Sequence, residues 1–218
     1  MNKIILVDDH SLFREGIKLL IENNGMGEVI AEADNGKVFL EKLNLFKPDL
    51  VIMDIEMPVM NGLDATKKAL EIYPDLKVLV LTMLSDKENY QEMIQAGAIG
   101  FVLKTSGKKE FEKAIQTVMS GESYFSNDLL RQIIFNIDPK TSNSVNIDKK
   151  TSKIKFTLRE KEVLMYFCQG LTVSEIADKL FLSPKTIETH RSTLLRKTKA
   201  KNTLNLVLLA IKNKMVEI

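Results

Sequence analysis

Five short β-rich runs alternate with amphipathic segments of helical length between residues 1 and 104, and this alternation restricts the possible folds more than any other feature. Several runs are apolar throughout, as expected for parallel strands covered on both faces. The runs are KIILV (3–7), EVIAEA (28–33), DLVIM (49–53), KVLVLT (77–82) and GFVL (100–103). Repeated strand–helix units predict an α/β fold with a doubly wound, five-stranded parallel sheet in the flavodoxin-like order 2-1-3-4-5.

The second half of the chain shows helical patterns without strands. Its 218 residues exceed the usual size of one domain, so two domains are favoured. A helical pattern at 127–137 precedes a segment rich in Ser, Asn, Thr and Lys at 139–153, which as a flexible coil would span ~20 Å. We therefore predict an α/β domain over 1–125, a helix and linker over 126–153, and a small all-α domain of four helices over 154–218.

The charge is distributed unevenly between the two halves. Residues 1–150 contain 18 Lys and Arg against 23 Asp and Glu, whereas residues 151–218 contain 13 against 6. The basic half is a candidate for contact with the phosphate backbone of nucleic acid, although charge alone is a weak signal.

Other compositional features exclude several classes of protein. No apolar run approaches ~18 residues and no signal segment is visible, so we expect a cytoplasmic protein without a membrane partner. Cys168 is the only cysteine, which excludes an intrachain disulfide and a multi-cysteine metal site. Its helical context favours a small core residue over a reactive thiol.

Polar residues follow four of the predicted strands: Asp8 and Asp9 the first, Asp54 the third, Thr82 the fourth and Lys104 the fifth. Ligands of open α/β sheets bind beyond these strand ends. One Asp after a strand is usually a helix cap or turn residue, but this combination is hard to reach by chance. Three carboxylates in one cleft repel one another unless a cation neutralises them or a proton is retained, and oxygen ligands suit Mg²⁺. A carboxylate beside Mg²⁺, with a Lys and a hydroxyl opposite, could accept a phosphoryl group.

Residues 1–125 resemble the receiver domain of two-component response regulators. The motifs LVDDH, VIMDIEMPVMNG, LT (81–82) and GFVLK (100–104) occur in that family's order and spacing. The resemblance implies that a histidine kinase phosphorylates this domain with the help of Mg²⁺. It assigns Asp54 as phosphoacceptor, Asp8, Asp9, Asp54 and the backbone carbonyl of Glu56 as Mg²⁺ ligands, and Thr82 and Lys104 as contacts of the phosphoryl group.

The same resemblance gives expectations for the loop after the third strand and for the residues that would move on phosphorylation. Pro58 would fix a backbone angle after the third strand, and Gly62 would permit a positive φ before the next helix. Phe101 occupies the place of the family's switch aromatic, often Tyr, and would follow Thr82 inward on phosphorylation. Met83 and Glu56 hold positions that influence phosphoryl lifetime in the family, in a direction that the sequence leaves open.

In the basic half, Ser183 is a good N-cap and Pro184 fits the first helical position, which predicts a helix to about residue 197. Ile187, Leu194 and Thr198 share its inner face. Periodicity alone is equally consistent with a solvated surface helix and with one that inserts its outer face into a major groove.

Residues 157–215 resemble the LuxR-type helix-turn-helix, through LREKEVL, the joint at 170–171, EIADKLFLSPKTIETH and RSTLLRK. The resemblance implies a supporting helix at 174–180 and a recognition helix at 184–197. It suggests as base readers Glu188, Thr189 and Ser192, and as phosphate contacts Lys185, Thr186, Arg191, Arg196 and Lys197. Glu188 could instead pair with a neighbouring basic residue. His190 is more consistent with packing than with metal binding, because no second ligand lies at metal spacing.

Together the two resemblances indicate a DNA-binding transcriptional regulator of the NarL/FixJ class. It would read promoter half-sites as a homodimer, paired through its last helix, when phosphorylated or bound to DNA. We do not expect an enzyme beyond the domain's assistance to its own phosphorylation and dephosphorylation.

Three alternatives remain open from the residues. A phosphatase with an Asp nucleophile would need a DxD-type pair after the first strand, where Asp8 and Asp9 are adjacent. A flavin module would need small and hydroxyl residues at the DDH segment. The same architecture could also act independently of phosphorylation.

Overall fold

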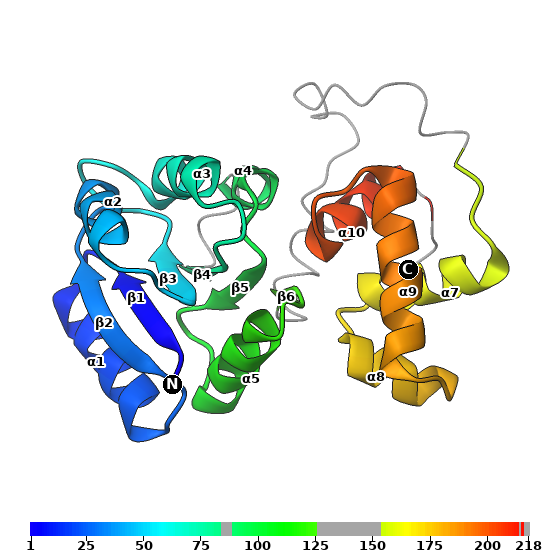
Figure 1. Cartoon of the computed structure of the whole chain (residues 1–218), viewed down its shortest axis with the longest axis horizontal. Helices are drawn as coiled ribbons and strands as arrows, with labels where there is room; N and C mark the ends of the chain where they lie inside the picture. The colour runs from blue at the N-terminus through cyan, green and yellow to red at the C-terminus, as the bar shows by residue number, and fades with distance from the viewer. Residues whose placement is uncertain (84–88, 126–153, 214, 216–218) are drawn as a thin grey trace. The chain divides into compact units, whose positions relative to one another are not determined.

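The computed structural model describes residues 1–83, 89–125, 154–213 and 215, and Figure 1 shows their elements. The chain divides into two compact units, Met1–Phe125 and Ser126–Ile218. The helix expected at 127–137 and the linker at 139–153 lie outside the described residues. Among the described helices, none combines the length and apolarity needed to span a bilayer.

The first unit contains a parallel sheet in the order β2-β1-β3-β4-β5-β6. The predicted order of five strands is confirmed, and the prediction of only five strands is corrected by a sixth, which pairs with β5. This sixth strand has only two residues, which are too few to show a periodic pattern in the sequence. The strands are β1 (Lys3–Val7), β2 (Glu28–Ala33), β3 (Leu50–Asp54), β4 (Val78–Thr82), β5 (Gly100–Leu103) and β6 (Tyr124–Phe125).

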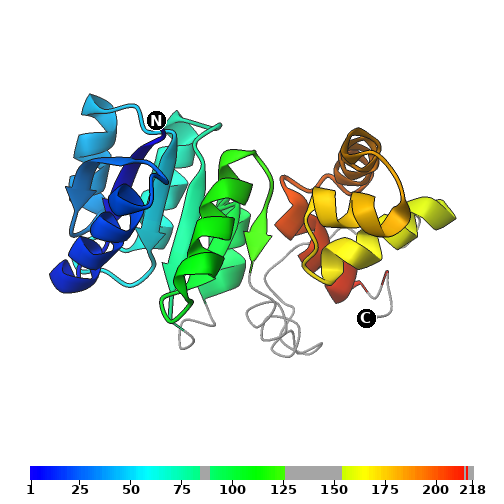
Figure 2. The same ribbon diagram turned by 90° about the horizontal axis from the view of Figure 1, so that it is seen from below.

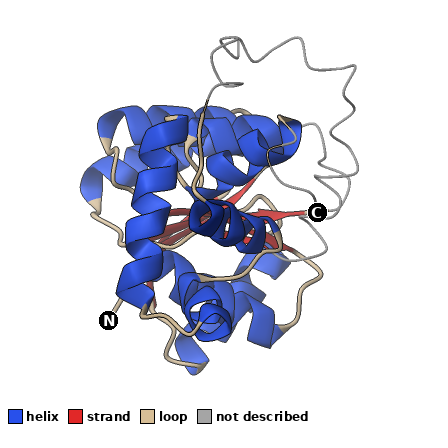
Figure 3. Ribbon diagram, turned by 90° about the vertical axis from the view of Figure 1, so that its right-hand side faces the viewer, coloured by secondary structure: helices blue, strands red, loops and turns tan. Residues whose placement is uncertain are grey.

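Helices cover both faces of this sheet, which lies between them in Figures 2 and 3. On one face of the sheet, apolar residues of the strands pack against apolar residues of α1 and α5 and form a hydrophobic core. Helices α2, α3 and α4 cover the opposite face (Figure 1). Strands β3 and β4 are buried along their whole length, which explains their continuous apolar sequences. The helices are α1 (Ser11–Asn23), α2 (Gly36–Leu45), α3 (Gly62–Ile72), α4 (Asn89–Ala96) and α5 (Lys108–Met119).

The described part of the second unit consists of four helices, as the sequence predicted: α7 (Leu158–Cys168), α8 (Val173–Leu180), α9 (Pro184–Thr198) and α10 (Thr203–Lys212). Capping boxes begin α7 and α8, and the side chain of Ser183 caps α9, with Pro184 at its first turn. Cys168 is buried, and this burial raises the pKa of its thiol to about 12. Its prediction as a core residue is confirmed.

Candidate functional site

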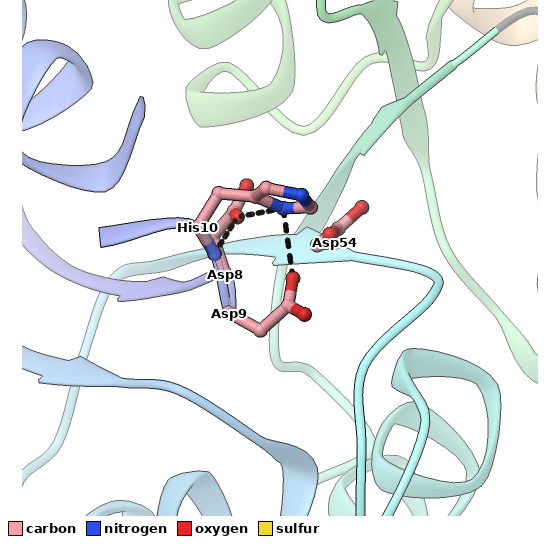
Figure 4. Close-up of side chains that lie close together, drawn as sticks. All are labelled: Asp8, Asp9, His10 and Asp54. Atoms are coloured by element: carbon pink, nitrogen blue, oxygen red, sulfur yellow. Dashed lines mark hydrogen bonds and ion pairs between the residues drawn. The ribbon is translucent and has the colours of Figure 1, made fainter. Parts of the chain in front are cut away.

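The register of the central strands brings two carboxylates together at the carboxyl edge of the sheet. Val7 of β1 pairs with Met53 of β3, so the residues that follow each of them, Asp8 and Asp54, lie side by side. Asp9 lies next to Asp8 in the close-up of Figure 4. Asp8 is fully buried and Asp54 is 3% exposed, whereas the side chain of Asp9 is 30% exposed. The sequence prediction that these three carboxylates meet is confirmed.

Lys104 lies between the two buried carboxylates. Its Nζ donates a hydrogen bond to Asp54 Oδ2 at 2.7 Å and forms an ion pair with Asp8 Oδ2 at 2.9 Å. The contact with Asp8 Oδ2 is an ion pair, and this oxygen accepts no hydrogen bond from the described residues. A buried carboxylate oxygen held only by charge keeps a lone pair available for a cation.

The electrostatics of this pocket favour a reactive carboxylate. Burial raises the pKa of Asp54 to about 6, although the hydrogen bond and charge of Lys104 act in the opposite direction. Burial lowers the pKa of Lys104, but the hydrogen bond to Asp54 and the two carboxylate charges raise it more, so the net pKa lies above its ordinary value. At neutral pH the pocket therefore holds a charged Asp54 beside a charged Lys104.

Thr82 is the last residue of β4, and Phe101 lies on β5, three residues before Lys104. Thr82 is fully buried and its hydroxyl donates to the carbonyl oxygen of Met83 at 3.1 Å. Tyr90, whose hydroxyl donates to the same oxygen at 2.8 Å, packs edge-on against Phe101 with ring centroids 6.4 Å apart. Sequence reasoning did not single out Tyr90.

The ring of Phe101 is fully buried in this conformation, and its movement on phosphorylation stays a prediction. A Phe ring has no hydroxyl that would hold it in water, so burial against Tyr90 is its favoured position.

The loop after β3 departs from the sequence expectation. The positive φ of this loop belongs to Val59, at 67°, and Gly62 has no positive φ. A Cβ on Gly62 would lie 1.9 Å from the backbone oxygen of Asp54. Glycine is therefore required here for the close approach of two backbones, and the predicted role of Gly62 as a residue of positive φ is wrong.

An open pocket of about 600 Å³ lies beside the carboxylates, lined in part by Asp9, His10, Glu56 and Pro58. Glu56 is exposed, so its side chain is free to influence what enters. His10, which sequence reasoning passed over, places its Nδ1 2.9 Å from Asp9 Oδ1 and 3.3 Å from Asp8 Oδ1. Ligand atoms of Asp8, Asp9, His10 and Asp54 all lie within 4.8 Å of one another, which fits a divalent cation.

Known domain families match both units. The response regulator receiver domain matches residues 4–116, and the luxR family of bacterial regulatory proteins matches residues 155–210. The chain belongs to the response regulator family. This response regulator combines a receiver domain with a LuxR-type DNA-binding domain and is a transcriptional regulator of the NarL/FixJ type.

Relatives match this response regulator along its full length. Response regulator GacA of Pseudomonas syringae is 36% identical over 100% of this chain and 99% of its own. Oxygen regulatory protein NreC of Staphylococcus aureus is 34% identical over 99% of each chain. The crystal structure of a LuxR-family response regulator from Aurantimonas superposes with a TM-score of 0.58 at 32% identity, covering 61% of this chain and 95% of that one.

Helix α9 of the response regulator exposes half of the residues that the resemblance suggested as DNA contacts. Four of the eight residues suggested as DNA contacts are exposed: Lys185, Thr189, Ser192 and Arg196. Thr186 is partly buried, and its hydroxyl lies 2.8 Å from that of Ser183 at the start of the helix. Glu188 forms an ion pair with Arg191 at 3.0 Å, which is the second of the two alternatives for Glu188. In this conformation, Glu188 and Arg191 are thus partners of one another.

Lys197 forms bonds within the domain in this conformation, and its predicted contact with phosphate stays a prediction. Its Nζ donates to both carboxylate oxygens of Glu160, at 2.8 and 2.6 Å, and to the carbonyl oxygen of Lys155 at 3.1 Å. An ammonium group has three donors, and these bonds use all of them. Periodicity could not reveal this, because Glu160 lies 37 positions earlier in the chain.

We expect the change Lys197→Met to destabilise the DNA-binding domain by about 1–3 kcal/mol, because it leaves the buried carboxylate of Glu160 without its cation. Burial raises the pKa of Glu160, but the bonds from Lys197 and the backbone of Thr157 lower it more, to a net value below normal. The stabilisation is therefore present above the unfolded pKa of about 4.3 and is lost as pH falls through the folded pKa.

Urea unfolding of the full chain measures this effect, with Arg196→Met as the control on the same turn of α9. The loss should shrink as the pH is lowered below about 4. Equal stability of the two variants at pH 7 would show that the pair is not structural.

Proposed function

We propose that a histidine kinase phosphorylates Asp54 of this response regulator, and that the phosphorylated form binds promoter DNA as a homodimer. The observation that carries this proposal is the contact of Lys104 with Asp54, at 2.7 Å, beside the buried Asp8. The match to GacA and NreC along both chains supports the same regulatory architecture.

The transfer is a displacement at phosphorus. An oxygen of Asp54 attacks the phosphorus of a phosphohistidine, the new O–P bond forms, the N–P bond breaks, and the imidazole leaves with the electron pair and takes up a proton. The Lys104 ammonium neutralises charge on the phosphoryl oxygens. The hydroxyl of Thr82 reaches these oxygens only by giving up its bond to the carbonyl of Met83.

Mg²⁺ fits the donors at this edge of the sheet. Asp8, Asp9 and Asp54 would hold it, with the backbone carbonyl of Glu56 as a further ligand, and the close approach of the three carboxylates supports this assignment. When bound, Mg²⁺ offsets the negative charge that the phosphoryl group brings to a pocket of carboxylates.

The exposed face of α9 is the proposed reader of the major groove. Thr189 and Ser192 would meet base edges, while Lys185 and Arg196 would contact phosphates. Glu188 could accept from cytosine only if its pair with Arg191 opens. A structurally similar protein, RcsB, has been solved as a complex with DNA, and as two dimers on two DNAs, which supports a similar mode here.

Selection of DNA fragments from a random pool tests this function. We expect the full chain held in beryllofluoride with Mg²⁺ to enrich a repeated half-site that the untreated protein enriches weakly. Enrichment of one motif to the same extent in both states would favour a regulator that does not depend on phosphorylation.

Salt dependence tests the proposed phosphate contacts. Affinity for the selected site should fall with a slope of about −0.9 per phosphate contact on a log–log plot against salt. Lys185→Gln or Arg196→Gln should reduce that slope by about 1 per subunit, whereas the exposed Lys68→Gln of the receiver domain should leave it unchanged. Equal slopes in all four proteins would place the phosphate contacts elsewhere.

A further inference from the structure

His10 stands at a helix start where its side chain has no helix-stabilising role. It is the N-cap residue of α1, and its side chain makes no cap hydrogen bond. Ser, Thr, Asp and Asn are the residues that normally satisfy the first N–H groups of a helix. The imidazole ring instead lies across Asp8 and Asp9 in Figure 4, with the dashed lines from its Nδ1 to both carboxylates.

The spacing of these atoms matches a coordination shell. Two ligand atoms at right angles around a small divalent cation, each about 2.1 Å from it, are about 3.0 Å apart. His10 Nδ1 lies 2.9 Å from Asp9 Oδ1 and 3.3 Å from Asp8 Oδ1. The other oxygen of the buried Asp8 carboxylate, Oδ2, lies 2.9 Å from Lys104 Nζ, so Oδ1 is the oxygen that faces the imidazole.

The nitrogen donor changes which cations the cleft prefers. Carboxylates, carbonyls and water suit Mg²⁺, whereas imidazole suits first-row transition metals such as Fe²⁺, Ni²⁺ and Zn²⁺. A cluster of three carboxylates and one imidazole is therefore a mixed oxygen and nitrogen site. Such a site should bind a transition cation more tightly than the carboxylates alone, with little gain for Mg²⁺.

We propose that His10 is a metal ligand through Nδ1, and that it makes the receiver pocket selective for first-row transition cations over Mg²⁺. The inference rests on the proposed function in that it uses the same three carboxylates. It adds His10 as a ligand, and it adds first-row transition cations as competitors that would occupy the pocket in place of Mg²⁺.

Co²⁺ is a suitable probe, because its bound form absorbs in the visible range and shifts the proton resonances of ligating imidazoles. The full chain contains only two histidines, His10 and His190, and its single thiol, Cys168, is buried. We expect the wild type to bind Co²⁺ with one strongly shifted, exchangeable ring N–H resonance, and Mg²⁺ to displace it only at a large excess.

Two variants assign that resonance. His10→Ser, which supplies a good N-cap and keeps all three carboxylates, should lose the shifted resonance and about 10-fold or more of the Co²⁺ affinity. Its affinity for Mg²⁺, measured by competition, should change by less than about 3-fold. His190→Asn, altered in the other unit of the chain, should match the wild type in all three measurements.

Bound Co²⁺ without a shifted ring resonance in the wild type would overturn the inference and leave the proposed function intact. An unchanged ratio of Co²⁺ to Mg²⁺ affinity in His10→Ser would overturn it in the same way. A wild type that takes up neither cation would contradict both this inference and the Mg²⁺-dependent function, so the two failures are distinguishable.

Discussion

Replacement of Asp54 by Asn is expected to abolish phosphorylation of the chain, by a factor of at least about 1,000 in rate. The amide has nearly the shape of the carboxylate but lacks the anionic oxygen that attacks phosphorus. Labelling by radioactive acetyl phosphate with Mg²⁺ measures the loss. The exposed Asp75→Asn is the matched control and should be labelled like the wild type.

The fold of the Asp54→Asn variant should be more stable than that of the wild type. Burial raises the folded pKa of Asp54 to about 6, above the unfolded value of about 3.9. The folded state therefore binds more protons between these values, and stability falls as pH rises through them. Asn avoids this cost, so at pH 7 we expect a gain of at most about 3 kcal/mol, reduced because Lys104 loses its charged partner. Full labelling of a stable Asp54→Asn protein would exclude Asp54 as the phosphoacceptor.

The change Gly62→Ala should have the largest effect on stability, with a loss of about 3–5 kcal/mol in the receiver domain. Its Cβ would meet the backbone oxygen of Asp54 at 1.9 Å, a clash that a rotamer change cannot relieve. Because the atom that must give way belongs to Asp54, the remaining folded protein should also accept phosphate more slowly.

Thermal unfolding of the full chain, followed by calorimetry, measures this loss. Gly16→Ala is the matched control, because a Cβ there meets nothing within 4 Å and Ala favours the middle of helix α1. We expect this control to be as stable as the wild type or slightly more so. A Gly62→Ala variant of equal stability would show that the loop after β3 can move away from Asp54 at little cost.

The parts of the fold that follow from local pattern were predictable. Apolar runs fixed the five long strands, and the Ser183-Pro184 pair fixed the start of α9, since both signals lie within a few residues of the elements they define. The strand β6 was missed because pairing with β5 alone defines its two residues.

The pocket was predictable from the residues that follow the strands, because parallel strands bring their carboxyl ends to one edge. Asp8, Asp54 and Lys104 meet for this reason. Three-dimensional contacts decided what the sequence could not: the approach of Gly62 to the Asp54 backbone and the burial of the Phe101 ring. His10 was visible in the DDH segment, but only the direction of its ring shows that it faces the carboxylates.

The affinity of the full chain for its selected DNA site, with and without beryllofluoride and Mg²⁺, tests the central claim most directly. We expect the phosphate mimic to increase the affinity of the wild type by about 10-fold or more, within the range of coupling energies between sites in switching proteins, and to leave Asp54→Asn unchanged. Equal affinities of the wild type in the two states, or the same increase in Asp54→Asn, would contradict control of DNA binding through this carboxylate.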